Sequence, residues 1–482
     1  MMFSRILSGI CGVAFALILP EVIRAADDDV NLGPLYTRDT TINGDKRVRI
    51  LGPLYEQSTS TNGRVVKSLR PVFTRSVESD GRDNRTDLLW PLATAITSSN
   101  EVSSRFALMY YVNKDKSNPM SRWHLWIVPL LFMGRNAGGH GYFGIFPLGG
   151  KVSEVLVFDE MKFFLFPLYA HTVRGREETT EILWPFISVT RGDGVKRARI
   201  FPIYGRTIRP GISESMFLFW PIMTWARFVV PGQEGGGFVL FPFIGRIYRP
   251  ESKSWLIFPP LFKWTEGARL REINMPWPFV QYSSGRANRL YLWPLAGVKQ
   301  EPGMRDGFLL WPIVSSSHHE IGGEVIDRFS ILPLFQYANY SRTVGPTNDL
   351  KTVSTASSVK LWPLWSKRTV GGTTTVKLPA LWPGSDNEPI ENTYAPLWTL
   401  FSRTDTENSS DSELLWGMIR RRTGPTEASS TIFPLVNWKR TKGDVETQDW
   451  SFLLGLIGYR KEGDHGSLRL LFMDFGGRKK GK

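Results

Sequence analysis

The chain has 482 residues, of which 42% are hydrophobic and 13% aromatic, and its formal net charge is +14 at pH 7. Apolar and aromatic residues at this level can bury enough surface to fold, which excludes wholesale disorder. The single cysteine excludes a disulfide framework and a cysteine-based metal site.

The N-terminal segment has the features of an export signal. Arg5 precedes an apolar stretch over residues 6–19, and Ala25 ends a small-residue cleavage sequence. The stretch is too short to cross a bilayer comfortably, and no later segment approaches the roughly 18 unbroken apolar residues of a membrane span. The lone cysteine, Cys11, lies inside this segment. We therefore predict a signal peptide over residues 1–25 and an exported protein of the periplasm or outer membrane, with the cell surface as a further location.

The mature chain is built from a short repeat. An apolar segment with a proline inside it recurs about every 19 residues, as in Leu165-Phe166-Pro167 and Leu183-Trp184-Pro185. Self-similarity at a short fixed period indicates one repeat array rather than separate domains. We count about 24 units over residues 26–476, followed by a basic tail over residues 477–482. The clearest motif prolines are Pro91, Pro129, Pro147, Pro167, Pro185, Pro202, Pro221, Pro242, Pro294 and Pro312.

Each unit reads as one strand and one turn. Residues 162–174 are rich in aromatic and β-branched residues and end at a polar turn around Gly175. Short loops with Gly and Asp between apolar strands are hairpin signals, so neighbouring strands should run antiparallel. No segment after the signal has a convincing helical period. The sequence therefore predicts an all-β protein whose tandem strand-turn repeats form an antiparallel meander.

The proline inside each strand has two interpretations. Proline cannot donate to a β-ladder, so it belongs at sheet edges, strand starts or bulges. Two units carry Gly417 and Gly455 at the equivalent position, and glycine also marks bulges. In the first interpretation every strand bends at its proline, and the sheet curls along that line. In the second, the proline begins a short strand after a loop.

The architecture that encloses the strands also has two alternatives. Successive residues at the motif are apolar, as in residues 217–223, which indicates that both faces are covered there and favours a curled or folded-over sheet with a dry interior. The alternative is a closed outer-membrane β-barrel, in which apolar and polar residues alternate. The chain alternates poorly, but many hairpins, abundant aromatic residues and export are typical of such barrels.

Tryptophans such as Trp184, Trp293 and Trp311 mostly precede the motif proline. In stacked strands they would form a row of indole rings. A packed core row is the favoured interpretation, because apolar residues flank them on both sides. The other interpretation is an exposed strip that stacks on carbohydrate or lies at a membrane interface.

Basic residues follow the motif in many units. If the units stack in register, these residues form bands along the rims of the sheet, suited to an anionic envelope polymer or lipid. The alternative is a solvated rim that prevents aggregation of strand edges. Nucleic acid is not expected as a partner of an exported chain, and a partner protein cannot be identified. The candidate residues of this rim are Arg174, Arg191, Arg206, Arg227, Arg246 and Lys263.

The sequence offers no recognisable catalytic or metal-binding constellation. His318 and His319 are adjacent, so in a strand they point to opposite faces, and no second ligand group has a metal-site spacing. Carboxylates such as Asp159 and Glu160 are not spaced in a way that singles out a glycosidase pair. We therefore expect no enzyme activity, no cofactor and no bound metal.

These observations predict a non-catalytic repeat protein of the bacterial cell envelope. It would act as a structural or binding scaffold for an envelope polymer, a lipid or a partner protein. The alternative function is an integral outer-membrane β-barrel that serves as a channel or export port.

Overall fold

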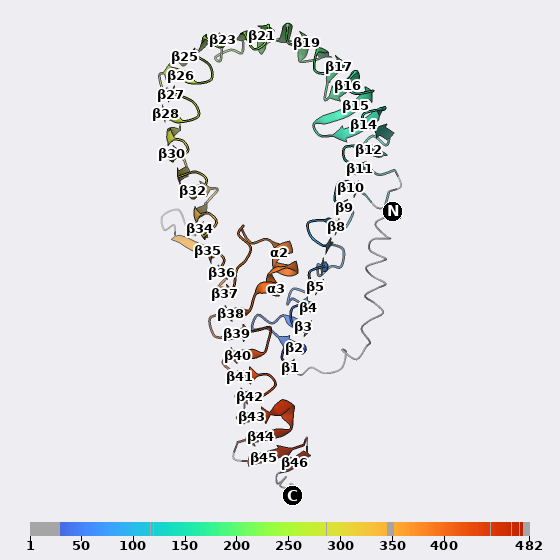
Figure 1. Ribbon diagram of the computed structural model, residues 1–482, viewed down its shortest axis with the longest axis vertical. Helices are drawn as coiled ribbons and strands as arrows, with labels where there is room; N and C mark the ends of the chain where they lie inside the picture. Colours follow the sequence, from blue (N-terminus) through green and yellow to red (C-terminus); the bar gives the residue numbers. More distant parts are fainter. Residues whose placement is uncertain are drawn as a thin grey trace. The chain divides into compact units, whose positions relative to one another are not determined.

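The computed structural model describes residues 29–475, except positions 116, 119, 286, 345–350, 444, 464 and 472. The predicted signal peptide and the basic tail therefore lie outside the described residues. Within the described part, the chain forms strands β1 to β46, two short helices, α2 (Glu388–Thr393) and α3 (Ala395–Trp398), and a 3-10 turn, η2 (Leu453–Gly455) (Figure 1). The predicted all-β fold is confirmed.

The strands belong to two compact units. Unit 1 comprises residues 1–99 and 333–482, and unit 2 comprises residues 100–332. The strands of the first part of unit 1 are β1 (Val30–Leu32), β2 (Tyr36–Thr40), β3 (Lys46–Ile50), β4 (Tyr55–Thr59), β5 (Val65–Leu69), β6 (Phe73–Val77), β7 (Asn84–Leu88) and β8 (Ala93–Thr97). Those of the second part are β34 (Phe335–Val344), β35 (Lys351–Leu361), β36 (Trp365–Val370), β37 (Thr373–Leu378), β38 (Phe401–Asp405), β39 (Ser410–Leu414), β40 (Ile419–Thr423), β41 (Glu427–Ile432), β42 (Val436–Thr441), β43 (Thr447–Phe452), β44 (Ile457–Glu462), β45 (His465–Leu470) and β46 (Met473–Phe475).

Unit 2 holds the most regular part of the repeat. Most of its strands have five to seven residues. They are β9 (Val102–Phe106), β10 (Met109–Asn113), β11 (Trp123–Ile127), β12 (Leu131–Arg135), β13 (Gly141–Ile145), β14 (Gly149–Val155), β15 (Phe158–Phe164), β16 (Tyr169–Arg174), β17 (Glu177–Ile182), β18 (Ile187–Gly192), β19 (Val195–Ile200), β20 (Tyr204–Arg209), β21 (Ser213–Leu218), β22 (Met223–Phe228), β23 (Gly235–Leu240), β24 (Ile244–Arg249), β25 (Ser252–Ile257), β26 (Phe262–Gly267), β27 (Leu270–Asn274), β28 (Val280–Gly285), β29 (Asn288–Leu292), β30 (Ala296–Glu301), β31 (Met304–Leu309), β32 (Val314–Ile321) and β33 (Glu324–Ile331).

Strands that follow one another in the chain pair antiparallel within each unit. In unit 2, β16 pairs with β15 on one side and with β17 on the other, and this order continues along the chain. In unit 1, β1 pairs with β2 and β46 with β45, and no pairing joins the two end strands among the described residues. The sheet is therefore an open meander, as the first of the two predicted architectures requires.

The chain reverses direction at each motif proline, which corrects the prediction that each strand bends there and continues. β15 ends at Phe164 and β16 begins at Tyr169, so Pro167 lies in the turn between them. All ten motif prolines named above follow a cis peptide bond. Each repeat is therefore a hairpin of two short strands rather than one bent strand. In a turn the proline is not required to donate to the ladder, which removes the conflict between proline and a central strand.

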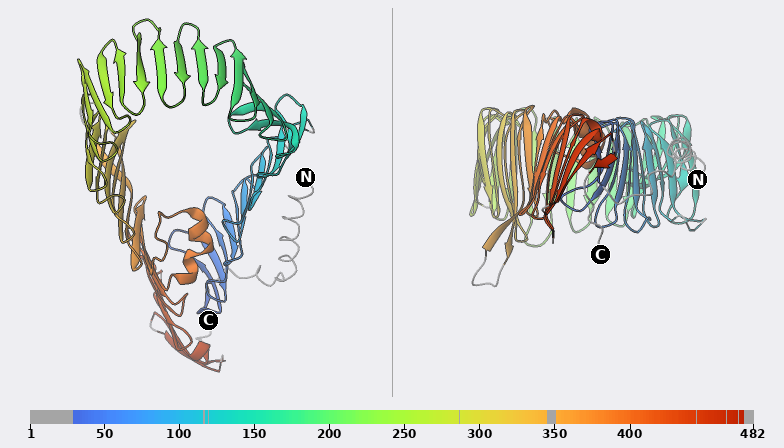
Figure 2. Two further views of the ribbon diagram at one scale, coloured as in Figure 1. Left: turned by 45° about the horizontal axis from the view of Figure 1, so that its top comes forward. Right: turned by 90° about the horizontal axis from the view of Figure 1, so that it is seen from below.

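The two faces of the unit 2 sheet differ in side-chain size. One face carries small residues that are almost fully buried, such as Ala170, Ser188 and Thr190. The opposite face exposes large residues such as Ile187 and Tyr204. Side chains on the inner side of a bend have less room than those on the outer side, so this difference favours curvature toward the small residues. The strands of unit 2 do stand side by side in a curved row (Figure 2).

Unit 1 is folded over, so that strands of its first part face strands of its second part. β2 and β3 lie beside β39 and β40, and α2 and α3 lie between β5 and β37 (Figure 1). Side chains rather than strand pairing hold this arrangement: the Arg70 side chain donates to the Asn392 carbonyl at 2.7 Å, and the Tyr394 hydroxyl donates to the Trp90 carbonyl at 2.5 Å. The predicted folding over of the sheet is thus present inside unit 1.

The expected dry interior along the motif is wrong. Phe219 and Trp220, which precede Pro221, are 54% and 50% exposed. The one buried hydrophobic cluster in the described residues is small and lies around Tyr142 and Phe163, where only Phe146 and Phe166 of the motif pack against it. The apolar run of the motif was read as two covered faces of a strand, but these residues form a turn, where neither face of the sheet covers them.

Candidate functional site

The proline turns of unit 2 all lie at the same end of its strands, along the border of the sheet that runs across the strands rather than along an outermost strand. Because successive strands run in opposite directions, the turns after odd-numbered strands all emerge at the same edge, and the polar hairpins after even-numbered strands emerge at the other. We call the first the proline edge and the second the hairpin edge. The turns of the proline edge that follow β15 to β31 are residues 165–168, 183–186, 201–203, 219–222, 241–243, 258–261, 275–279, 293–295 and 310–313.

Backbone hydrogen bonds connect each turn of the proline edge to the next. The Leu168 N–H closes its own turn by donating to the Leu165 carbonyl at 2.9 Å. The Trp184 N–H then donates to the Pro167 carbonyl of the preceding turn at 2.8 Å. The same link joins Trp220 to Pro202 and Trp311 to Pro294, at 2.7 Å each. In these turns the proline carbonyl accepts a hydrogen bond, and the missing N–H of proline is not required. Backbone hydrogen bonds of this kind join successive turns along the proline edge.

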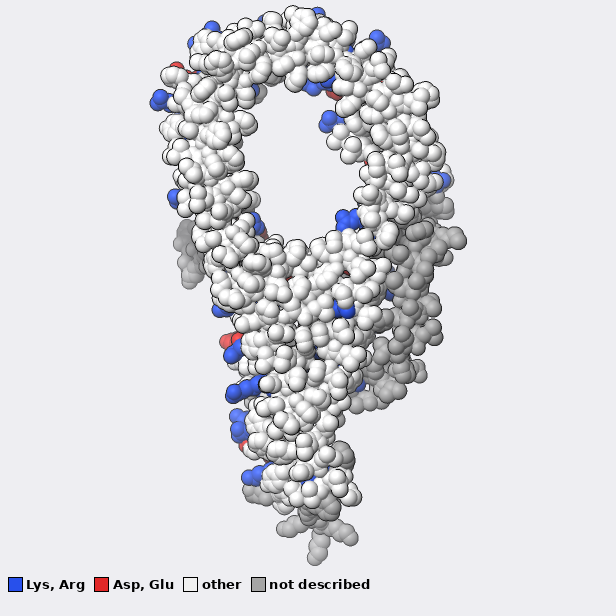
Figure 3. Space-filling model, in the orientation of Figure 1, with Lys and Arg blue, Asp and Glu red and all other residues white. Residues whose placement is uncertain are grey.

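The residue after each motif proline projects from the proline edge into solvent. Phe243 and Leu295 are each 60% exposed. Exposed residues at the equivalent position of other turns are Phe186, Ile203, Ile222, Leu261, Phe279 and Ile313. Over β16–β32, the side of the molecule in view in Figure 3 is almost uncharged, with Lys and Arg at its margins. Contiguous exposed apolar surface of this extent marks an interaction site, so the proline edge is the strongest candidate.

The aromatic residues before the prolines form a row of interacting rings along this edge. The ring centroids of Phe201 and Trp220 are 5.3 Å apart, and those of Trp293 and Trp311 are 6.0 Å apart. Trp311 is nevertheless 53% exposed. The favoured interpretation of a packed core row is therefore wrong for Trp184, Trp220 and Trp311, which are about half exposed, whereas Phe146 and Phe166 do pack against the buried cluster around Tyr142.

One face of unit 2 continues the apolar surface from the proline edge into the strands. We call it the apolar face and describe it as three rows at increasing distance from the edge. The first row includes Tyr169, Ile182, Ile187, Ile200, Tyr204, Leu218, Met223, Leu240, Ile244 and Ile257, which are cross-strand partners in sequence. The second row includes Trp225, Phe238, Arg246, Trp255 and Trp264. The third row includes Arg191, Lys196, Glu214, Arg227, Lys253 and Glu266.

The six predicted basic residues do not form a single band. Four of them lie on the apolar face: Arg191, Arg206, Arg227 and Arg246. The other two, Arg174 and Lys263, lie on the opposite face, because their cross-strand partners are Glu177 and Asn274. The sequence shows how many residues separate each basic residue from its proline. The face on which the side chain lies, however, depends on whether its position counted from the first residue of the strand is odd or even. That first residue is set by the exact length of the turn.

Several of these basic residues already have partners within the sheet. Arg206 pairs with Glu214 at 2.5 Å, and Lys263 pairs with Glu272 at 2.8 Å. The Arg246 guanidinium lies 4.9 Å from the centre of the Trp255 ring, a cation–π contact on the apolar face. Arg191 and Arg227 are exposed in the third row. The apolar face therefore combines an aliphatic row, a row with aromatic rings and arginine, and a charged row.

The opposite face carries small hydroxyl residues that bond to one another across strands. The Ser254 and Thr265 hydroxyls are 2.8 Å apart, and those of Thr179 and Thr190 are 2.9 Å apart. Such pairs satisfy polar groups that the crowded face removes from water. We call this the small-residue face.

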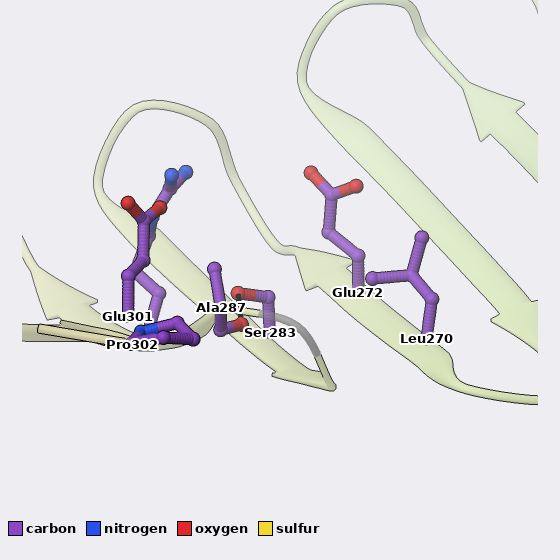
Figure 4. A pocket seen from close by; sticks show the side chains of 7 residues that line it. Leu270, Glu272, Ser283, Ala287, Glu301 and Pro302 are labelled. Carbon is purple, nitrogen blue, oxygen red and sulfur yellow. Dashed lines mark hydrogen bonds between the residues drawn. The ribbon is translucent and has the colours of Figure 1, made fainter.

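A shallow pocket of about 570 Å³ opens on the small-residue face of β27–β31 (Figure 4). Its lining residues are Leu270, Glu272, Ser283, Ala287, Arg289, Glu301 and Pro302. Both carboxylates are engaged by lysines, Glu272 by Lys263 and Glu301 by Lys299, at 2.8 Å each. Each carboxylate of the pocket is thus occupied by an ion pair with a lysine of the sheet.

Unit 1 contains a buried ion network that joins β2 and β3 to β39 and β40. Asp39 of β2 accepts from Arg420 of β40 at 2.5 Å, and Arg49 of β3 binds both carboxylate oxygens of Glu413 of β39, one of them at 2.9 Å. Arg420 also pairs with Asp411 at 2.6 Å. The network joins strands more than 360 residues apart in the sequence.

The network also determines the protonation of its carboxyl groups. Burial alone would raise the pKa of Asp39, but the guanidinium groups of Arg47 and Arg420 outweigh burial and hold it well below its usual value. In the same way Arg49 outweighs burial and lowers the pKa of Glu413. These carboxylates are therefore ionised at every physiological pH, and the network is a structural clamp.

The sequence analysis did not identify this network. Its signal is the repetition of like charges two residues apart, Arg47 with Arg49, Asp411 with Glu413, and Arg420 with Arg422. That spacing places both charges on one face of a strand, which is costly unless opposite charges face them. No local pattern, however, states which distant strand supplies those charges.

A second polar cluster, around His124, is buried in unit 2. His124 Nδ1 lies 2.5 Å from the Tyr142 hydroxyl, and Nε2 lies 3.1 Å from Glu154. The Trp126 indole N–H donates to the same hydroxyl at 3.0 Å. Burial lowers the pKa of His124 and raises that of Tyr142 to about 12. Because His124 is only 3% exposed, the cluster satisfies polar groups inside the sheet and offers no surface for a substrate.

No family model matches the chain, and no curated protein matches it. In the part of the chain that the structure describes, no helix has both the length and the apolar character needed to cross a bilayer. The same residues include no group of three or more His, Cys, Asp or Glu side chains placed to hold a metal ion.

Proposed function

We propose that the chain is an exported, non-catalytic scaffold of the bacterial cell envelope, located in the periplasm or at the outer membrane. It presents an extended β-sheet to an envelope lipid, polymer or partner protein. The observation that carries this proposal is the proline edge, where exposed apolar residues such as Phe186, Ile222 and Leu295 recur turn after turn. A surface repeated in this way suits an extended partner better than a small substrate.

The chemistry of the remaining groups supports a non-catalytic role. The carboxylates of the pocket and of the ion network are paired with lysine or arginine, and the most buried histidine, His124, is enclosed by the sheet. A general acid or base needs access to a substrate and a pKa near the working pH. His124 lacks that access, and the carboxylates are occupied by ion pairs, so the proposal assigns no reaction to the chain.

Cell fractionation tests the proposal. The full chain is expressed in a Gram-negative host, and a matched control lacks residues 2–25. We expect the full chain in the periplasmic or outer-membrane fraction with a processed N-terminus, and the control in the cytoplasm. Equal retention of both chains in the cytoplasm would contradict export and, with it, the envelope role.

A further inference from the structure

We propose that the proline edge and the apolar face of unit 2 dock onto one leaflet of an anionic lipid membrane. This inference rests on the envelope role proposed above and names the partner of its sheet. The docking surface consists of the exposed tips Phe186, Ile203, Ile222 and Phe243, together with the three rows of the apolar face.

The dimensions of the apolar face fit one leaflet. From Ile187 in the first row to Arg191 in the third row is four residues, or about 13 Å along an extended strand. Half of a bilayer hydrocarbon core is about 15 Å thick. The exposed residues of the proline turns and the first row of the apolar face can therefore enter the acyl-chain region, while the third row remains among the lipid headgroups. A six-residue strand extends about 20 Å, less than the roughly 30 Å of the whole hydrocarbon core.

The order of residue types along the apolar face matches the profile of a membrane interface. Over β22–β26, mostly aliphatic residues lie next to the proline edge, aromatic rings such as Trp255 and Trp264 follow, and the third row holds Arg227, Lys253 and Glu266 together with Gly236 and Tyr248. Trp prefers the headgroup level, where its ring is amphipathic, and Arg and Lys extend their charge toward water and phosphate. Arg246, stacked on Trp255, combines both properties.

The charge on this face favours anionic lipid. Between β16 and β26 the basic side chains of the apolar face are Arg191, Lys196, Arg206, Arg227, Arg246 and Lys253, and the acidic ones are Glu178, Glu214 and Glu266. Six positive charges thus face three negative ones on this face, with Arg206 and Arg246 in the second row and the other four basic residues in the third row, where lipid phosphates would lie. Each basic residue near an anionic membrane surface strengthens binding by about 1 kcal/mol, or about fivefold.

The variety of the tips favours lipid over a polysaccharide or a protein. The position after the motif proline holds Phe, Ile or Leu in different turns, as at Phe243, Ile222 and Leu295, so hydrophobicity is kept while shape is not. A protein partner packs against particular shapes, whereas acyl chains accept any apolar side chain. A polysaccharide requires polar groups beside its stacking rings, and these tips carry none.

Vesicle flotation tests the inference. The exported protein, purified after removal of the predicted signal peptide over residues 1–25, is mixed with phosphatidylcholine vesicles, with or without 30% phosphatidylglycerol, at low and at high salt. We expect strong binding to the anionic vesicles at low salt, and weaker binding both to the neutral vesicles and at high salt. Equal binding to both kinds of vesicle at every salt concentration would contradict the role of charge.

Two multiple variants and one matched control locate the docking surface. The tip variant is Ile203→Ser, Ile222→Ser and Phe243→Ser, and the charge variant is Arg191→Ser and Arg227→Ser. The control, Arg174→Ser and Arg209→Ser, removes the same number of positive charges from the opposite face, at the ends of β16 and β20 away from the proline edge. We expect the tip variant to bind at least tenfold more weakly. The charge variant should bind about fivefold more weakly per arginine, and the control should bind within twofold of the parent protein.

The outcomes separate this inference from the proposed function. Circular dichroism and gel filtration confirm that each variant is folded before its binding is compared. Folded tip and charge variants that bind vesicles as well as the parent would overturn the lipid inference, while export would still support an envelope scaffold with another partner. Vesicle binding by a chain that is never exported would overturn the proposed function instead.

Discussion

At the scale of single residues, the most consequential groups are charged and buried. Arg49 and Glu413 lie in the interface between β3 and β39, where each has few alternative partners. A buried ion pair contributes little net stability compared with apolar residues of similar size, but the loss of one partner leaves an uncompensated buried charge. The pair therefore specifies which strands of unit 1 face each other.

Removal of the charge on Glu413 should loosen this part of unit 1. We expect Glu413→Gln to lower the opening free energy of β39 and β40 by about 3–5 kcal/mol, because Arg49 and Arg47 lose their counter-charge. Hydrogen exchange followed by mass spectrometry measures this opening. The control is Asp193→Asn, in an exposed pair with Arg176, which should change stability by less than about 1 kcal/mol. Unchanged exchange in β39 after Glu413→Gln would contradict the clamp.

Acid should weaken the same strands. The pKa values of Asp39, Asp411 and Glu413 are lower in the folded chain than in an unfolded one. The unfolded state therefore binds more protons as the pH falls through about 4, and the stability present at neutral pH is progressively lost. Hydrogen exchange of β39 and β40, corrected for the intrinsic pH dependence of exchange, should show less protection at pH 3.5 than at pH 6. In Glu413→Gln the pH effect should be smaller, and an equal effect in both proteins would assign it to other groups.

At the scale of elements, the feature that recurs from repeat to repeat is the proline turn rather than a sequence pattern of the strands. The proline turns link to one another by backbone hydrogen bonds, as between Trp184 and Pro167. Two turns use glycine instead: Gly417 and Gly455 have φ values of +98° and +90°. L-residues with a side chain rarely adopt such values, so glycine there has a conformational reason.

Substitution of Gly417 should be costly for that reason. We expect Gly417→Ala to destabilise unit 1 by about 1–2 kcal/mol, because alanine at positive φ is strained. Gly194→Ala, in a hairpin of unit 2 with open space around it, is the matched control and should change stability by less than about 0.5 kcal/mol. Urea unfolding followed by tryptophan fluorescence provides the comparison. Equal midpoints for the two variants would contradict the conformational account.

The elements also show what the sequence can predict. The 19-residue period, the all-β composition and the antiparallel order follow from apolar runs and turn residues, which are local properties. The position of the proline within its element was misjudged, because a run such as residues 217–223 is apolar both in a buried strand and in an exposed turn. A buried strand and an exposed turn differ in whether neighbouring strands pair with the run, and those neighbours lie outside the run in the sequence.

The candidate site was predicted in part for the same reason. Nine of the ten named motif prolines lie on the proline edge of unit 2, and four of the six basic residues lie on the apolar face, since their spacing from the turn is local; Pro91 lies in unit 1. The exposure of Trp220 and the placement of Lys263 on the opposite face depend on the exact length of each turn. The ion network of Asp39 with Arg420 depends on the folding over of unit 1, which no local pattern encodes.

At the scale of the whole molecule, the two units differ in the kind of surface and contact that they contain. Unit 1 is fastened by buried charges and by contacts such as that of Tyr394 with Trp90. Unit 2 exposes a long apolar edge and a face whose residues grade from aliphatic to charged. An exposed apolar surface this long would promote aggregation unless a partner covers it, and in our proposal a lipid surface is that partner.

The most direct test of that claim compares the two edges of unit 2 in the same protein. Cys11 is the only cysteine, so a Cys11→Ser background accepts a single polarity-sensitive dye at Ile222→Cys on the proline edge or at Asp193→Cys on the hairpin edge. With anionic vesicles, we predict a blue shift and quenching by brominated acyl chains for the dye at position 222 and no change for the dye at position 193. No change at either position, or a response only at position 193, would contradict the docking of the proline edge on lipid.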